Sequence, residues 1–336
     1  MSLHSSASVR PAAALIAVRA KLLQGRRHHP SWATVDARLA ECLRARFAAD
    51  PPQLRRIDTQ TAPFILDQIV HYEAVHAISG VPDLWRRLQA DRRCYALFSA
   101  ALPDQPLVFM ELAFTRGLSG DVSEVLDTDS PVIDPATCDC ALFYSISSCH
   151  DGLRGIPFGN ALIRQVVERL QQELPWLRAF GTVSPVPGFR TWLADLARRR
   201  DGPLVDILRI LDEGQWGWPP DTSDRLEATV LPLCATYLLD AKRGAEPLDA
   251  VARFHLGNGA RLERLNWLGD RSADGFARSA GITANYLYDL PSVDTNRDAY
   301  QATHAVIAAP QIEARARDAQ RHLDDEVDSA RHAGRA

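Results

Sequence analysis

Lysine is almost absent from this sequence of 336 residues: of its 38 basic residues only Lys21 and Lys242 are lysines, and the others are arginines. Arginine forms forked hydrogen bonds with phosphates and carboxylates. The net charge of -4 provides no basic excess, and nucleic acid is therefore not expected as a partner. No apolar run approaches the ~20 residues of a membrane-spanning helix, so the sequence predicts no membrane span.

Disulfide spacing is missing as well. The six cysteines follow no small-domain pattern, and a chain of this length buries a core without cross-links. Three nucleotide-binding or hydrolase motifs are also absent, namely GxxxxGK[ST], GxGxxG and GxSxG. Their absence argues against a P-loop, a dinucleotide fingerprint and a serine-hydrolase elbow. A reducing cytoplasm is the expected location.

Acidic residues are missing from the first 35 positions, which include Arg19 and Arg26. Such a segment has two interpretations: an organellar transit peptide, or a basic amphipathic helix from Ala12 to Leu23. The helix is preferred, because transit signals are loosely defined.

Helical periodicity dominates the first 90 residues and then changes to alternation. The alternation predicts two strands, Cys94–Ser99 and Pro106–Phe114, joined by a turn. A polar connection with one short helix follows over 115–138. Helices are expected at 10–24, 31–48, 60–71, 82–90, 190–200, 202–217 and 224–240, and a charged helical tail at 310–332.

The clearest unit is strand–loop–helix–strand. Ala141–Ser147 reads as a strand, 150–159 as a glycine-bearing loop, Asn160–Leu174 as an amphipathic helix and Ala179–Ser184 as a returning strand. A glycine-rich loop before a helix N-terminus favours an anion such as a diphosphate. An ordinary tight turn is the alternative.

Several residues could carry chemistry, and each has a structural alternative. Ser184 ends a strand and precedes Pro185 and Pro187, so it is either held for catalysis or caps the next helix. His255 lies before a glycine-rich turn and is either a proton carrier or a buried structural histidine. Tyr288 ends an alternating aromatic run and is either core or a substrate contact. A zinc site could be imagined from a group of cysteines with an aspartate and a histidine, but their spacing fits no usual zinc motif, and no metal is expected. The residues are Cys138, Asp139, Cys140, Cys149 and His150.

These signals occur in order in one family. From about His28 to Tyr300 the chain resembles malonyl-CoA decarboxylase. The resemblance is carried by Tyr72–Ile78 (YEAVHAI), Arg92–Tyr95 (RRCY), Phe143–Ser147 (FYSIS), Gly152–Gly155 (GLRG), Phe180–Phe189 (FGTVSPVPGF), Ala252–Ala260 (ARFHLGNGA), Leu265–Leu268 (LNWL) and Ala284–Tyr288 (ANYLY).

The resemblance implies an α+β (mixed α/β) fold, with a catalytic domain like the acetyltransferases (GNAT) after a reduced helical N-terminus. It predicts a helical segment at 1–75, a catalytic domain at 76–310 and a charged tail at 311–336. It aligns Ser184 with a catalytic serine, His255 with a catalytic histidine and Tyr288 with an active-site tyrosine. It also aligns an acyl-CoA-binding loop with Arg154, Gly155, Ile156, Pro157, Phe158, Gly159 and Asn160.

The implied function is decarboxylation of malonyl-CoA to acetyl-CoA and CO2 in fatty acid metabolism. No cofactor is expected, because the CoA thioester is the substrate. Two departures matter: most of the family's helical domain is missing, which puts homo-oligomerisation in doubt, and Pro157 replaces a position that is often acidic. The substrate is therefore open to a carrier-protein-bound malonyl group or a substituted malonyl. The alternatives are an acyltransferase and a non-catalytic acyl-CoA-binding module.

Overall fold

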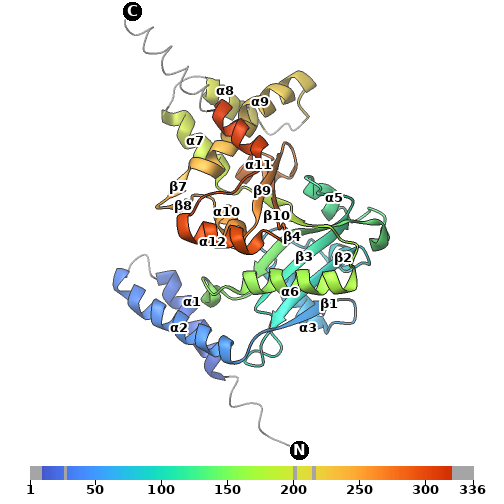
Figure 1. Cartoon of the computed structure of the whole chain (residues 1–336), viewed down its shortest axis with the longest axis vertical. Helices are drawn as coiled ribbons and strands as arrows, with labels where there is room; N and C mark the ends of the chain where they lie inside the picture. Colours follow the sequence, from blue (N-terminus) through green and yellow to red (C-terminus); the bar gives the residue numbers. More distant parts are fainter. Residues whose placement is uncertain (1–9, 26–28, 200–202, 214–216, 320–336) are drawn as a thin grey trace, which may run out of the picture. The chain divides into compact units, whose positions relative to one another are not determined.

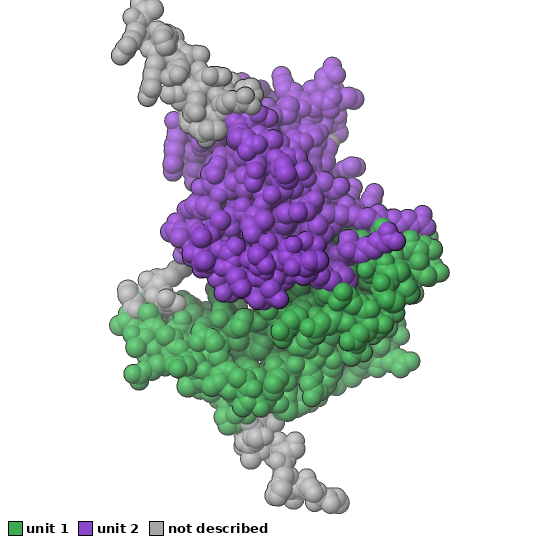
Figure 2. Space-filling model, viewed as in Figure 1, with its two compact units in different colours: residues 1–114, 128–177 green, residues 115–127, 178–336 purple. Residues whose placement is uncertain are grey.

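Helices and strands occupy most of the residues that the computed structural model describes, which are 10–25, 29–199, 203–213 and 217–319 (Figure 1). The chain divides into two compact units (Figure 2). Unit 1 comprises Met1–Phe114 and Thr128–Leu177, and unit 2 comprises Thr115–Asp127 and Arg178–Ala336. These boundaries differ from the expected divisions near 75 and 310, since the units follow contacts in space rather than changes of sequence pattern.

Unit 1 is built on strands whose order in the sheet is β1-β2-β3-β4, and the pairs β1–β2 and β2–β3 are antiparallel. Their register places Ile57 opposite Cys94, and Tyr95 opposite Met110. Nearly all residues of β2 and β3 are buried, which explains their almost continuous apolar sequence. The strands are β1 (Gln53–Ile57), β2 (Arg92–Phe98), β3 (Val108–Thr115) and β4 (Cys140–Ser148).

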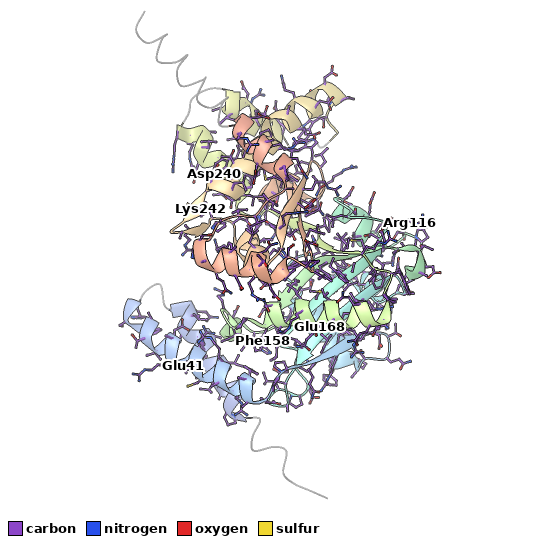
Figure 3. The ribbon with its side chains drawn as sticks, in the orientation of Figure 1. Glu41, Arg116, Phe158, Glu168, Asp240 and Lys242 are labelled. Carbon is purple, nitrogen blue, oxygen red and sulfur yellow. The ribbon has the colours of Figure 1, made fainter. Side chains whose placement is uncertain are left out.

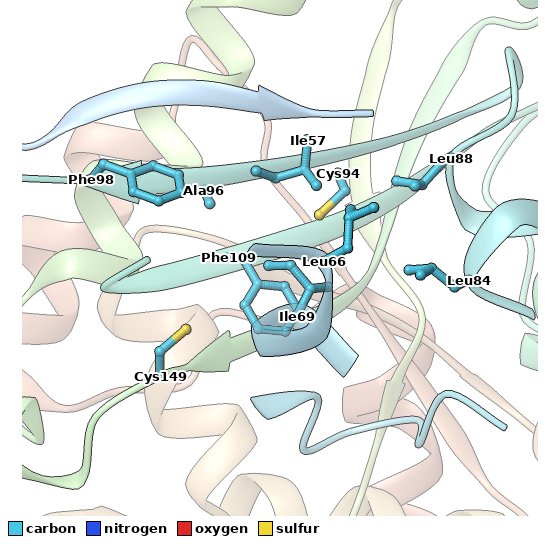
Figure 4. Packing of buried hydrophobic residues seen from close by; sticks show 10 residues of the cluster. All are labelled: Ile57, Leu66, Ile69, Leu84, Leu88, Cys94, Ala96, Phe98, Phe109 and Cys149. Atoms are coloured by element: carbon cyan, nitrogen blue, oxygen red, sulfur yellow. The ribbon is translucent and has the colours of Figure 1, made fainter. Parts of the chain in front are cut away.

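Helices cover both faces of the strands in unit 1. Figure 4 shows Leu66 and Ile69 of α3 against the face that carries Cys94, Ala96 and Phe98. The opposite face is covered by α6, whose apolar stripe is fully buried. The helices are α1 (Arg10–Gly25), α2 (Ala33–Ala49), α3 (Pro63–Tyr72), α4 (Val81–Arg87) and α6 (Phe158–Glu173), with single turns η1 (Pro30–Trp32), η2 (Pro135–Thr137) and η3 (Asp151–Leu153).

One element differs from the expectation of a purely helical segment over residues 1–75. Gln53–Ile57 forms β1 and pairs with β2 along its whole length. Pro51 and Pro52 end the preceding helical pattern, and the edge strand tolerates Arg55 and Arg56, which are both exposed. Tertiary pairing, rather than local propensity, decides this segment.

Unit 2 is organised around β10, which pairs antiparallel with β5, β6 and β9. Its strands are β5 (Ala179–Thr182), β6 (Ser184–Pro185), β9 (Arg261–Asn266) and β10 (Thr283–Leu287), with a small hairpin of β7 (Lys242–Arg243) and β8 (Glu246–Pro247). Its helices are α5 (Val122–Leu126), α7 (Phe189–Arg199), α8 (Pro203–Asp212), α9 (Pro220–Asp240), α10 (Ala250–Gly257), α11 (Ala273–Ser279) and α12 (Val293–Thr303).

The chain end is helical over 310–319, as expected, and the rest of the predicted tail lies outside the described residues. Within the described part of the chain, no helix is long and apolar enough to cross a membrane.

Candidate active site

Ser184 is buried in unit 2, at the start of a short strand that leads into a turn at 187–188; residues 184–188 are called the Ser184 turn. It forms β6 with Pro185 and pairs with Ala284 of β10. Two residues later, the backbone N–H of Val186 donates to the hydroxyl of Ser279 at 3.0 Å. The next helix, α7, begins only at Phe189, and the Ser184 hydroxyl donates instead to Thr182 Oγ1 at 2.9 Å. The helix-capping alternative for Ser184 is therefore wrong.

His255 lies in α10 and is buried, with 5 % of its surface exposed. Its Nε2 atom is 3.3 Å from the Ser184 hydroxyl oxygen, although the two residues are 71 positions apart in sequence. On the other side of the ring, Nδ1 is 2.8 Å from the Tyr288 hydroxyl. Tyr286 stacks on the imidazole at a centroid distance of 4.7 Å. The structure thus brings the three predicted residues Ser184, His255 and Tyr288 together.

The hydrogen-bond network assigns the proton on the imidazole. Because Ser184 donates to Thr182, its oxygen is an acceptor toward His255, and Nε2 carries the hydrogen. Nδ1 is then the acceptor and Tyr288 the donor. Thr182 Oγ1 also accepts the backbone N–H of Tyr286 at 3.1 Å, which fixes its orientation. The result is a directed chain from Tyr288 through His255 and Ser184 to Thr182.

Burial decides the charge of these groups. It lowers the pKa of His255 to about 3, because a charged imidazole loses its hydration in the interior. It raises the pKa of the Tyr288 hydroxyl for the same reason. Both groups are therefore neutral at pH 7, and the site presents an uncharged Nε2–H beside a serine.

The loop Arg154–Asn160 belongs to unit 1 and has the expected strand–loop–helix geometry, between β4 and α6. Gly155 has φ +78°, a left-handed conformation that favours glycine. Phe158, Gly159 and Asn160 form the first turn of α6, and the backbone N–H of Phe158 donates to the carbonyl of Ile156 at 2.8 Å. Figure 3 labels Phe158 at the start of this helix and Glu168 further along it. The first turn contains no acidic residue, so its partial positive charge is available to an anion.

Arg154 has a side chain that is 76 % exposed and lies 3.7 Å from the Asp151 carboxylate. A contact of this length at the surface contributes little. The Arg154 guanidinium is therefore accessible to a phosphate group from solvent.

Hydrogen bonds in unit 1 join two of the segments that carry the family resemblance, YEAVHAI and FYSIS. The carboxylate of Glu73, from YEAVHAI, accepts hydrogen bonds from Ser145 at 2.7 Å and Ser147 at 3.2 Å, both from FYSIS. It also accepts the backbone N–H groups of Val75 and His76. This cluster attaches the chain after α3 to β4, the strand that leads into the loop.

The cysteine-rich segments form no metal site in the described part of the chain, where no three His, Cys, Asp or Glu side chains come together suitably. Cys138, Cys140 and Cys149 are buried and form no disulfide within the described residues. Burial raises the pKa of the Cys149 thiol.

Sequence reasoning missed Thr182, Tyr286 and Asp249, which surround the site. Thr182 and Tyr286 occupy alternating positions on β5 and β10, where core packing was the expected role. Asp249 carries a recognisable signal, since an aspartate directly before a helical run is typical of an N-cap.

In unit 2, a buried serine, histidine and tyrosine are joined by hydrogen bonds, an arrangement suited to proton transfer. Unit 1 separately contains a glycine-bearing loop before a helix N-terminus, a feature that favours anions. The family model described as "Malonyl-CoA decarboxylase C-terminal domain" matches residues 52–326. The chain belongs to this family. It is 34% identical to the mitochondrial malonyl-CoA decarboxylase of Anser anser anser over 284 residues, which are 77% of this chain and 56% of that protein. Against the Rattus norvegicus enzyme it is 30% identical over 89% of this chain and 66% of that protein. The chain thus spans little more than half to two thirds of these relatives.

Solved structures agree with this assignment. The malonyl-CoA decarboxylases of Rhodopseudomonas palustris and Agrobacterium vitis are each 42% identical to this chain, with TM-scores of 0.82 and 0.83. Each match covers 90% of this chain and 75% of the other. The predicted mixed α/β fold is confirmed.

Proposed function

We propose that this protein decarboxylates malonyl-CoA, or a closely related malonyl thioester, to the acetyl thioester and CO2. The observation that carries the proposal is the contact of Ser184 with His255 and of His255 with Tyr288 in one buried cluster. Family membership supports the same reaction.

The reaction depends on the position of the malonyl group and on stabilisation of the negative charge that develops on the thioester oxygen, more than on a cofactor. When the bond between the α-carbon and the carboxylate breaks, its electron pair passes to the α-carbon and the thioester oxygen, and CO2 leaves. The resulting enolate takes up one proton to become the acetyl group. The protein must hold the carboxylate perpendicular to the thioester plane, stabilise the oxyanion and deliver that proton.

Ser184 positions the malonyl carboxylate or the thioester by hydrogen bonding, because its hydroxyl is fixed between Thr182 and His255. His255 protonates the α-carbon from Nε2, the nitrogen that faces the serine. A substrate carboxylate next to the ring raises the pKa of His255 above its value in the empty site. Proton uptake therefore accompanies substrate binding, and the proton consumed by the reaction comes from water.

The loop Arg154–Asn160 anchors the CoA diphosphate through backbone N–H groups and the Arg154 guanidinium. Its support is the left-handed Gly155, the acid-free first turn of α6 and the exposed arginine. Tyr288 holds the imidazole ring in its orientation through the contact with Nδ1. No cofactor is needed, since the thioester carbonyl accepts the electrons.

The experiment is turnover of malonyl-CoA by wild type and by His255→Asn, with acetyl-CoA and CO2 measured by mass spectrometry. Loss of a general acid costs about 10²–10⁴ in rate, so the variant should be nearly inactive while remaining folded. His304→Asn is the matched control, since His304 lies in unit 2 beyond α12. Wild-type turnover by His255→Asn would show that the imidazole does not carry the proton.

The same assay tests which malonyl thioester is the substrate and whether the protein is a decarboxylase, an acyltransferase or a binding module. Methylmalonyl-CoA and malonyl carrier protein are the substrates to compare, since Pro157 changes the loop where an acidic residue is expected. Release of CoA only when an amine is added would instead indicate an acyltransferase. Tight binding of malonyl-CoA without CO2 would indicate a binding module. Roles in the cytoplasm and in fatty acid metabolism, and assembly into an oligomer, stay predictions.

A further inference from the structure

The carboxylate of Asp249 lies at the N-terminus of α10, the helix that carries His255. One oxygen, Oδ1, accepts the backbone N–H groups of Val251 at 2.9 Å and Ala252 at 2.8 Å. This arrangement is an N-cap, which satisfies N–H groups that have no partner in the helix. A cap alone requires neither a charge nor deep burial, yet Asp249 is only 1 % exposed.

The rest of the carboxylate faces the turn that holds Ser184. It accepts the backbone N–H of Gly188, four residues after the serine, and the hydroxyl of Tyr237 lies 3.4 Å from Oδ2. One side chain therefore accepts hydrogen bonds from the start of the His255 helix and from the end of the Ser184 turn. All of these residues belong to unit 2.

The packing around Gly188 shows how closely these segments approach. A Cβ atom at Gly188 would lie 2.2 Å from the Tyr237 hydroxyl and 3.9 Å from Asp249 Oδ2. The turn is held a second time where Val186 donates to Ser279, which is fully buried. The Ser184 turn is thus attached to α11 through its middle and to α10 through its end, and Asp249 makes the attachment that involves His255.

We propose that Asp249 is a positioning residue for the reaction, whose carboxylate sets the distance between the Ser184 hydroxyl and His255 Nε2 by joining Gly188 to the N-terminus of α10. The proposal rests on the proposed function, in which Ser184 and His255 act on the same malonyl group. A charged side chain is suited to this task because charge-assisted hydrogen bonds are about twice as strong as neutral ones. A displacement of about 1 Å between reacting groups costs on the order of 10² in rate.

The test compares Asp249→Asn and Asp249→Ser with wild type in malonyl-CoA turnover. Asparagine and serine are both good N-caps, so α10 keeps its cap. The serine is too short to reach Gly188, and the asparagine amide would set an N–H against the N–H of Gly188. We expect kcat to fall about 10²-fold with KM changed less than about threefold, because the nucleotide-binding loop is untouched. The solvent deuterium isotope effect on kcat should rise, since misaligned proton delivery becomes slower.

Asp121→Asn is the matched control, because Asp121 caps α5 in the same unit through Ser123 N–H at 2.8 Å. It should leave kcat unchanged. If both Asp249 variants keep wild-type kcat, or if the apparent kcat falls only in proportion to the loss of folded protein, the positioning role is wrong. His255→Asn separates the two ideas: activity retained there overturns the proposed function, whereas loss there with full activity in the Asp249 variants overturns only this inference.

Discussion

The hydroxyl of Tyr288 lies 2.8 Å from Nδ1 of His255, on the side of the imidazole opposite to Ser184. This contact fixes the imidazole so that Nε2 faces the serine. Tyr288 therefore acts on the proposed reaction by orienting His255.

Tyr288→Phe removes this hydroxyl and leaves the ring in place. We expect kcat to fall about 10²-fold, a typical cost for a misdirected general acid, with a smaller effect on KM. Steady-state kinetics with malonyl-CoA measures both constants. Tyr300→Phe is the control, because Tyr300 is also buried and its hydroxyl makes no hydrogen bond within the described residues. Equal losses in the two variants would assign the effect to packing.

Burial of a neutral His255 predicts a dependence of stability on pH. The pKa is about 3 in the folded protein and about 6.5 in an unfolded chain. Between these values the unfolded chain binds the extra proton, so this group makes the free energy of unfolding rise with pH by up to about 1.4 kcal/mol per pH unit. The contribution of His255 to the free energy of unfolding is fully present above pH 6.5 and is lost as the pH falls toward 3.

His255→Asn should therefore be less sensitive to acid than wild type. Chemical denaturation at several pH values between 4 and 7 measures the free energy of unfolding of each protein. The advantage of wild type over the variant should shrink as the pH falls. His304→Asn serves again as control, and parallel pH curves for wild type and His255→Asn would contradict a buried neutral imidazole.

Local sequence patterns predicted most of the framework. Alternation indicated β2 and β3, and the apolar stripe over Leu162–Leu170 indicated α6, because these elements bury the faces that their periods create. β1 was missed, since an edge strand of five residues with two arginines carries little pattern of its own.

The site itself depends on contacts that no local pattern contains. Ser184 and His255 are 71 residues apart, and each has a plausible structural role when its neighbours alone are considered. Only the combined family resemblance predicted their meeting, which the structure confirms as geometry. Asp249 could be identified as an N-cap from sequence, but its second contact, with Gly188, arises from tertiary packing.

The anion-binding role of the loop predicts an effect confined to substrates with a nucleotide. Arg154→Ala should raise KM for malonyl-CoA about tenfold, the value of one charged hydrogen bond, and leave KM for malonyl-N-acetylcysteamine unchanged because that thioester lacks the diphosphate. Arg164→Ala is the control, with a side chain that is 72 % exposed on α6, the helix that follows the loop. A similar change in KM for both thioesters would place Arg154 at the acyl group instead.

The close contact between Gly188 and Tyr237 predicts a rescue. Gly188→Ala places a Cβ atom 2.2 Å from the Tyr237 hydroxyl, so the Ser184 turn must shift and kcat should fall about 10²-fold. In the double variant with Tyr237→Phe the nearest ring atom is Cζ at 3.3 Å, a contact that a small adjustment accommodates. The double variant should therefore be more active than Gly188→Ala alone, a non-additivity expected of residues in contact.

Gly217→Ala is the control for this rescue, since nothing lies within 4 Å of a Cβ atom at that position. Tyr237→Phe alone removes the 3.4 Å contact to Asp249 and keeps the Gly188 bond, so its kcat should fall less than that of Asp249→Ser. If the double variant is instead as inactive as the two single changes combined, the Tyr237 hydroxyl does not fix the turn. In that case the short approach at Gly188 has no part in holding Ser184 against His255.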